Sequence, residues 1–311
     1  MLVNSHHSIT SLELRPPFGR LLKERFIRWV FMVCAFFAVV ITFATLGMFV
    51  AESLPFFAQV SLGEFLGGIR WAPLHEPPSY GVLALVADTL VITAIALGVA
   101  LPLGLLSAVF LSEYASFRLR QVCKPILEVL AGVPTVVYGF FALRFVTPLL
   151  QRTFLPQLSF WNGLSAGLVM GIMIIPLVAS ISEEVLFAVP RRLREAAYAL
   201  GATKFEVTTR VVIPAASSGI GASFILALSR AIGETMIVAL AAGRTPAWPP
   251  DPTRPMLTIT TTIVNIATGD HEATAFIWSV LFALGFLLFL STLVFNVASH
   301  VIVRRFRERF P

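Results

Sequence analysis

The stretch VPRRLREAAYALGATKFEVTTRVVIPAA, residues 189–216, separates two long apolar runs of a 311-residue chain. It is basic, and its alanines favour a helix that Gly201 interrupts. Residues 204–212 can form a second short helix before Pro214 begins the next apolar run. We therefore expect a surface helix held at both ends by membrane spans, well placed to receive a push from a partner protein.

The apolar runs around this stretch indicate an integral membrane protein. Hydrophobic residues make up 57% of the chain and charged residues only 13%, whereas an average soluble domain carries about 25% charged residues. The sequence predicts an all-α fold of six transmembrane helices, because six runs are long enough to cross about 30 Å of hydrocarbon. These runs cover residues 26–50, 82–111, 126–148, 163–189, 214–242 and 276–303.

One integral domain is the simplest division of the chain, because no tandem repeat or low-complexity tail accompanies the spans. We expect a cytoplasmic N-terminal tail over residues 1–25 and a transmembrane domain over residues 26–311. Within that domain, residues 190–213 form the longest cytoplasmic loop.

Lys and Arg residues fall mainly on one side of the predicted spans. Seventeen of the 23 lie on the side that carries residues 189–216 and both termini, and four lie on the other side. Since cytoplasmic loops retain positive charge, both termini are expected in the cytoplasm. The net charge of +6 then follows from topology, and no nucleic-acid partner is implied.

Small residues recur at four-residue spacing in two spans, which favours close helix packing in lipid. They are Gly163, Gly167 and Gly171 in the fourth span, and Gly219, Ser223, Ala227 and Ala231 in the fifth. These faces can pack within the chain or against a second, similar subunit. Pro102, Pro134 and Pro176 are expected to bend the second, third and fourth spans.

The fifth span contains two charged residues, within LALSRAIGETMIVAL, residues 226–240. An ionised side chain near the bilayer centre costs about 2.5 to 3.5 kcal/mol, so Arg230 and Glu234 need a reason to be there. At positions i and i+4 they would share a helix face, with Glu234 partly neutralising Arg230. The planar donors of Arg suit an oxyanion. We therefore expect the pair to line an anion pathway; a structural ion pair between helices or subunits is the alternative.

Other titratable residues carry less weight. Arg144 is a weaker pathway candidate, while solvation at a helix end accounts for Glu183 and Glu184. No metal site is expected at the adjacent His6 and His7. The sequence contains no GxxxxGK[ST] phosphate loop and no arrangement of residues typical of catalysis, so no catalytic residue is predicted.

The 189–216 stretch carries a specific motif. It reads Glu195-Ala196-Ala197, three residues, Gly201, nine residues, then Val211, one residue, Ile213 and Pro214. This pattern resembles the EAA loop of ABC importer permeases, with Val and Ile in place of the usual Ile and Leu. The resemblance implies that Glu195, Ala196, Ala197 and Gly201 couple the chain to a separate ATPase. ATP and Mg would act at that ATPase, with no cofactor bound by this chain.

Further stretches extend the resemblance over nearly the whole chain from about residue 26. They are EFLGGIRWAPLHEPPSYGVLALVADTL, PLGLLSAVFLSEYA, KPILEVLAGVPTVVYGFFAL and SRAIGETM. Together they look like the permeases of phosphate-specific (Pst) importers, and more like the PstC subunit than PstA. The resemblance implies a type I ABC importer permease fold in the bacterial cytoplasmic (inner) membrane.

The Pst resemblance also implies partners and a pathway. The partners would be a PstA-like permease subunit, a PstB-like ATPase dimer and a PstS-like phosphate-binding protein, and the pathway would pass Arg230 and Glu234. A PstA-type sister subunit and a permease for another oxyanion, such as sulfate or molybdate, remain alternatives. The EAA loop speaks against a third alternative, an ATP-independent secondary transporter.

Overall fold

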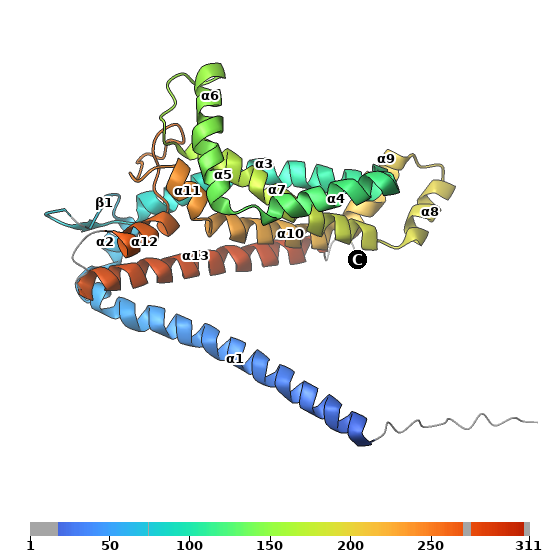
Figure 1. Ribbon diagram of the computed structural model, residues 1–311, viewed down its shortest axis with the longest axis horizontal. Coiled ribbons are helices and arrows are strands. Elements are labelled where there is room, and N and C mark those ends of the chain that lie inside the picture. The colour runs from blue at the N-terminus through green and yellow to red at the C-terminus, as the bar shows by residue number, and fades with distance from the viewer. Residues whose placement is uncertain (1–17, 74, 270–274, 308–311) are drawn as a thin grey trace, which may run out of the picture. The chain divides into compact units, whose positions relative to one another are not determined.

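The computed structural model describes residues 18–73, 75–269 and 275–307, and almost all of this part is helical (Figure 1). The α-helices are α1 (Phe18–Phe57), α2 (Leu62–Gly67), α3 (Leu83–Val109), α4 (Phe117–Gly132), α5 (Thr135–Phe141), α6 (Thr147–Thr153), α7 (Gly163–Ala188), α8 (Arg191–Ala199), α9 (Lys204–Val207), α10 (Ile213–Ile232), α11 (Met236–Ala241), α12 (Ile259–Thr268) and α13 (Ala275–Arg307). His6 and His7 lie outside the described residues.

Shorter elements complete this part of the chain. Three π-helical segments continue neighbouring α-helices, namely η1 (Phe110–Tyr114), η2 (Ala142–Val146) and η3 (Thr208–Val212). Two short strands, β1 (Trp71–Ala72) and β2 (Ser79–Tyr80), pair antiparallel. The chain divides into two compact units between Ala51 and Glu52. The sections below concern the second unit, which contains every element after α1.

The membrane spans agree with the predicted number when one bent pair is counted as a single span. In the described ranges, five helices are long and apolar enough to cross a bilayer, and they cover Lys23–Phe57, Leu83–Tyr114, Gly163–Ala188, Lys204–Ile232 and Ala275–Val301. The sixth is the pair Phe117–Gly132 and Thr135–Thr153, which meet at 89°. The predicted run over residues 126–148 is therefore not one continuous helix. Pro134 lies at the bend, where its missing N–H and fixed φ favour a new helix start.

The fifth span is displaced from the prediction of residues 214–242. Its helix begins at Lys204, because Thr203 and Glu206 form a capping box there. It continues through η3 into α10. Pro214 lies in the first turn of α10, directly after the widened π-helical turn of η3. At the other end, α10 stops at Ile232, and α11 begins only at Met236.

The core of the second unit is formed by long helices that run side by side, α3, α7, α10 and α13 (Figure 1). At the contact of α3 with α7, a Cβ added to Gly167 would lie 2.8 Å from Ile95 Cγ2, and one added to Gly171 would lie 2.7 Å from the Ala96 carbonyl. Only glycine permits this approach. On α10, Ser223, Ala227 and Ala231 are buried in this same chain. These small-residue faces thus pack within the chain, which was the first of the two predicted alternatives.

Candidate functional site

Arg230 and Glu234, the predicted pathway pair, lie on either side of a helix break. α10 ends at Ile232, and Gly233 follows it as the C-cap. Within the described part of the chain, no ion pair joins the two charged side chains. The predicted shared helix face and charge neutralisation are therefore wrong, because the helix that would supply the i, i+4 geometry stops between the two residues.

Glu234 is buried, and its carboxylate bonds the backbone of the next helix. Its Oε1 accepts the N–H of Met236 at 3.0 Å and that of Ile237 at 3.3 Å. These are first-turn N–H groups of α11, which lack partners within the helix. Thr260 of α12 donates its hydroxyl to the Glu234 carbonyl at 3.0 Å. Glu234 thus fixes the start of α11 and its contact with α12.

Arg230 lies in the last turn of α10 and is exposed in the described chain. Its Nη2 lies 3.4 Å from Sδ of Met173 on α7, and a thioether sulfur is only a weak acceptor. Within the described residues, no carboxylate neutralises the guanidinium. Its planar donors are therefore free to bind an oxyanion.

The coupling loop lies at one end of the second unit, opposite α6, α11 and α12 (Figure 1). We call it the α8 end, comprising η1, α4, the last turn of α7, α8 and α9. The predicted helix, glycine and second helix are confirmed: α8 ends at Ala199, and Gly201 has a φ of +84°. This left-handed conformation favours glycine. The Thr203 capping box then starts α9.

The surface of the coupling loop suits a protein partner. Glu195 and Ala196 of the EAA motif are exposed, and Ala197 is half-buried against the neighbouring core. Large apolar side chains are exposed beside them, namely Leu193 (45%), Tyr198 (44%), Leu200 (90%) and Phe205 (68%). A cluster of apolar side chains on a polar surface is typical of an interaction site.

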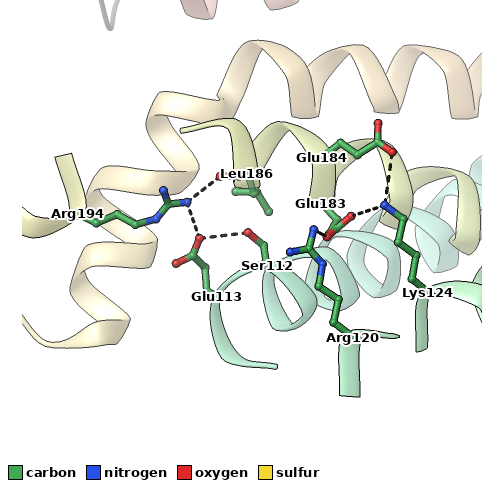
Figure 2. A network of polar contacts seen from close by, with 8 residues as sticks. All are labelled: Ser112, Glu113, Arg120, Lys124, Glu183, Glu184, Leu186 and Arg194. Atoms are coloured by element: carbon green, nitrogen blue, oxygen red, sulfur yellow. Dashed lines mark hydrogen bonds and ion pairs between the residues drawn. The ribbon is translucent and has the colours of Figure 1, made fainter. Parts of the chain in front are cut away.

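Arg194 joins α8 to two other helices (Figure 2), and with Glu113 it lines a cavity of about 360 Å³ that Glu195 and Tyr198 also line. Its Nη2 donates to Glu113 Oε1 of η1 at 2.9 Å and to the Leu186 carbonyl of α7 at 2.8 Å. Its Nη1 donates to the Val189 carbonyl. Ser112 donates its hydroxyl to the same Glu113 oxygen at 3.2 Å. The side chains of Arg194 and Glu113 are only 16% and 6% exposed, so this contact is largely shielded from water.

Glu183 forms a second ionic contact at the α8 end (Figure 2). Its side chain is 2% exposed and pairs with Arg120 and, at 3.4 Å, with Lys124 Nζ, both from α4. The Arg120 guanidinium also lies 4.4 Å from the ring centroid of Phe187. Solvation at a helix end does not account for Glu183, which is a correction to the prediction. It fits Glu184, whose side chain is 67% exposed and 3.7 Å from Lys124.

Asp88 ties α3 to the opposite end of the unit. We call this the α12 end, comprising the first turns of α3, α11, the loop of residues 242–258 and α12. Asp88 is fully buried, and its Oδ2 accepts the N–H of Ala247 at 3.0 Å and that of Leu257 at 2.9 Å. One carboxylate oxygen therefore holds both sides of the loop.

Further bonds hold the loop at the α12 end. The Met256 N–H donates to the Ala242 carbonyl at 2.9 Å. Thr253 donates its hydroxyl and N–H to Asp251, and these bonds hold the pKa of the Asp251 carboxyl below its usual value. A cavity of about 500 Å³ adjoins the loop, and Trp161 and Arg244 are among its lining residues. Arg230 does not line this cavity.

Sequence reasoning missed Glu113, Arg194 and Asp88 as polar contacts of the structure. For Asp88 a signal existed, because a lone carboxylate within an apolar run requires a buried partner. Arg194 was one basic residue among several in the coupling loop, and nothing in the sequence distinguished the one that points inward. No group of three or more His, Cys, Asp or Glu side chains in the described residues could hold a metal ion.

Comparison with known proteins places the chain in a family. Residues 100–308 match the family described as binding-protein-dependent transport system inner membrane component. The phosphate transport system permease protein PstC of Mesorhizobium japonicum is 37% identical over 263 residues, covering 78% of each chain. The probable PstC of Methanocaldococcus jannaschii is 32% identical and covers 88% of this chain and 92% of its own. The probable ABC transporter permease protein YqgH of Bacillus subtilis is 32% identical and covers 76% of each chain.

Solved structures agree in fold. One chain of a bacterial alginate ABC transporter, solved with an alginate-bound periplasmic protein, matches 93% of this chain at a TM-score of 0.65 and 15% identity. One chain of the MetNI methionine ABC transporter matches 73% of it at a TM-score of 0.53 and 19% identity. The predicted all-α type I importer permease fold is confirmed. The chain belongs to the family of binding-protein-dependent transport system inner membrane components, and is a PstC-like permease by its relatives.

Proposed function

We propose that the chain is the permease subunit of an ATP-driven ABC importer that moves inorganic phosphate across the cytoplasmic membrane. Relatives named PstC, at 32–37% identity over most of the chain, support the substrate. In this proposal a PstA-like permease completes the pathway, a PstS-like protein delivers phosphate, and a PstB-like ATPase dimer hydrolyses ATP with Mg. Residues 26–311 form the permease domain, residues 190–213 its coupling loop, and both termini lie in the cytoplasm.

The observation that carries the proposal is the exposed coupling loop. α8 presents Glu195, Ala196 and large apolar side chains outward at the end of the unit. A surface of this kind fits a groove on another protein better than it fits water. ATP-driven movement of that partner would push or pull α8 and, through it, the spans.

Arg230 supplies the anion contact in this proposal. Its guanidinium has no carboxylate partner among the described residues and lies near the end of α10. It therefore attracts phosphate without first having to break an ion pair. Glu234 acts through the backbone, since its carboxylate fixes the start of α11 beyond the break. Arg144 remains the weaker candidate because it was predicted toward the outer end of the third span, where a long side chain can reach water. Its guanidinium lies 5.6 Å from the ring centroid of Phe140.

Transport by the complete complex tests the proposal. The chain is reconstituted in liposomes with its partner permease, ATPase and binding protein, and uptake of labelled phosphate, sulfate and molybdate is measured. Uptake of phosphate alone, lost when ATP is depleted at a constant ion gradient, supports the proposal. Preference for another oxyanion would correct the substrate, and uptake without ATP would overturn the importer class.

A further inference from the structure

The contact of Arg194 with Glu113 raises a question about how α8 transmits movement. α8 has no buried residue, so apolar packing alone holds it weakly to the spans. Besides the backbone link to α7 through Val189 and Pro190, one guanidinium connects α8 inward. It bonds the Glu113 carboxylate and the Leu186 carbonyl (Figure 2), and also the Val189 carbonyl. Such a bond set is directional, because the planar donors of Arg fix both distance and orientation.

The three acceptors belong to two different spans. Glu113 lies in η1, which continues α3 without interruption, and the Leu186 and Val189 carbonyls lie in and just after the last turn of α7. α3 and α7 are packed closely through Gly167 and Gly171. A displacement of α8 reaches α7 through the backbone of Val189 and Pro190, and the Arg194 bond to Glu113 extends it to η1 and therefore to α3.

The local backbone supports this role for Glu113. η1 is a π-helical turn, and such turns are rare and occur frequently at functional sites. Glu113 is only 6% exposed, so removing Arg194 would leave a shielded carboxylate without its cation, which is unfavourable. The ion pair of Arg194 and Glu113 therefore favours contact between α8 and η1.

We propose that Arg194 and Glu113 are positioning residues that transmit movement of α8 to α3 and α7, so that ATP hydrolysis and anion passage remain coupled. The inference rests on the proposed function, since it requires a partner that moves α8. Arg194 borders the same cavity as Glu195, but it is half-buried, whereas Glu195 and Ala196 of the EAA motif are exposed and would contact that partner. Substitution of Arg194 or Glu113 should therefore leave docking of the ATPase intact and lower the phosphate imported per ATP hydrolysed.

The experiment measures phosphate imported per ATP hydrolysed in proteoliposomes that contain the complete complex. Glu113→Gln and Arg194→Lys are expected to assemble and hydrolyse ATP, with import per ATP lowered about tenfold, the effect of losing a charge-assisted hydrogen bond. Glu184→Gln is the matched control, because Glu184 is an acid at the same α8 end whose side chain is 67% exposed. It should retain the wild-type ratio.

Two outcomes would overturn the inference. Import per ATP equal to wild type in both variants would show that coupling does not pass through this pair. If Glu113→Gln fails to assemble, Glu113→Asp replaces it, since it keeps the charge on a shorter side chain; an unchanged ratio in that variant would make the pair a folding contact alone.

A second measurement does not depend on the transported anion. Hydrogen exchange of the backbone amides of residues 191–199, in the assembled complex without substrate, should become faster in Glu113→Gln than in Glu184→Gln. Equal exchange would contradict the link. A wild-type complex that imports no phosphate would instead overturn the proposed function, and this exchange measurement would still decide the inference.

Discussion

The two ends of the second unit hold their carboxylates in different ways. At the α8 end, Glu113 and Glu183 pair with Arg and Lys side chains from other helices. At the α12 end, Asp88 and Glu234 accept backbone N–H groups. Bonds between side chains can break and re-form as helices shift, whereas bonds to backbone fix a loop in one conformation. The α8 end is therefore suited to movement, and the α12 end to keeping one conformation.

Arg230 follows neither pattern, and its substitution should have the largest effect. Arg230→Gln is expected to lower phosphate uptake about a hundredfold, because a neutral amide loses the charge-assisted bond to the anion. Uptake of labelled phosphate by the reconstituted complex measures this loss of transport. Arg152→Gln, at an exposed cation in α6, is the control and should transport normally. Near-normal uptake by Arg230→Gln would remove this residue from the pathway.

Substitution of Asp88 tests the backbone contacts of the α12 end. Asp88→Ala leaves two buried N–H groups without an acceptor, so the free energy of unfolding in detergent should fall by about 3 kcal/mol. Asp88→Asn keeps one carbonyl oxygen and should cost about 1 kcal/mol. Denaturant unfolding of both variants gives the comparison. Equal losses would show that the loop does not depend on these two bonds.

Substitution of Glu183 tests the ionic contacts of the α8 end. Glu183→Gln leaves Arg120 and Lys124 without their buried anion. Because these cations are 25% and 34% exposed, water replaces part of the lost interaction. The expected loss in the free energy of unfolding is about 1 to 2 kcal/mol, smaller than for Asp88→Ala. Added salt should narrow the difference from wild type; a loss that salt does not change would argue against an ionic contact.

Glu184 should show the smallest effect. It lies beside Glu183, its one ionic partner in the described part of the chain is Lys124 at 3.7 Å, and its side chain is 67% exposed. Glu184→Gln is therefore expected to change the free energy of unfolding by less than about 0.5 kcal/mol. A loss as large as that of Glu183→Gln would mean that exposure does not separate these neighbouring acids.

The sequence predicted the fold class, the coupling loop and a bend of the third span at Pro134, and it misplaced the start of the fifth span. Length and hydropathy locate apolar runs but do not register where a helix breaks. Pro134 indicated the bend of the third run, and the capping box at Thr203 and Glu206 explains why the fifth begins at Lys204, before Pro214. In both cases a local backbone signal outweighed the apolar pattern.

Only part of the candidate site could be predicted from the sequence. The i, i+4 spacing of Arg230 and Glu234 suggested a pair, but Gly233 ends the helix and directs Glu234 to the backbone of α11. The contact of Arg194 with Glu113 joins residues far apart in the chain. Spacing rules apply within one helix, so only the packing of α8 against η1 and α7 could show it.

The position of Arg194 also alters the electric field at the end of α7. The last carbonyls of a helix carry a partial negative charge, equivalent to about half an electron charge for the whole terminus. The Arg194 guanidinium lies on the Leu186 and Val189 carbonyls and on the Glu113 carboxylate, so the residue that holds α8 in place also offsets part of the negative charge at this helix terminus.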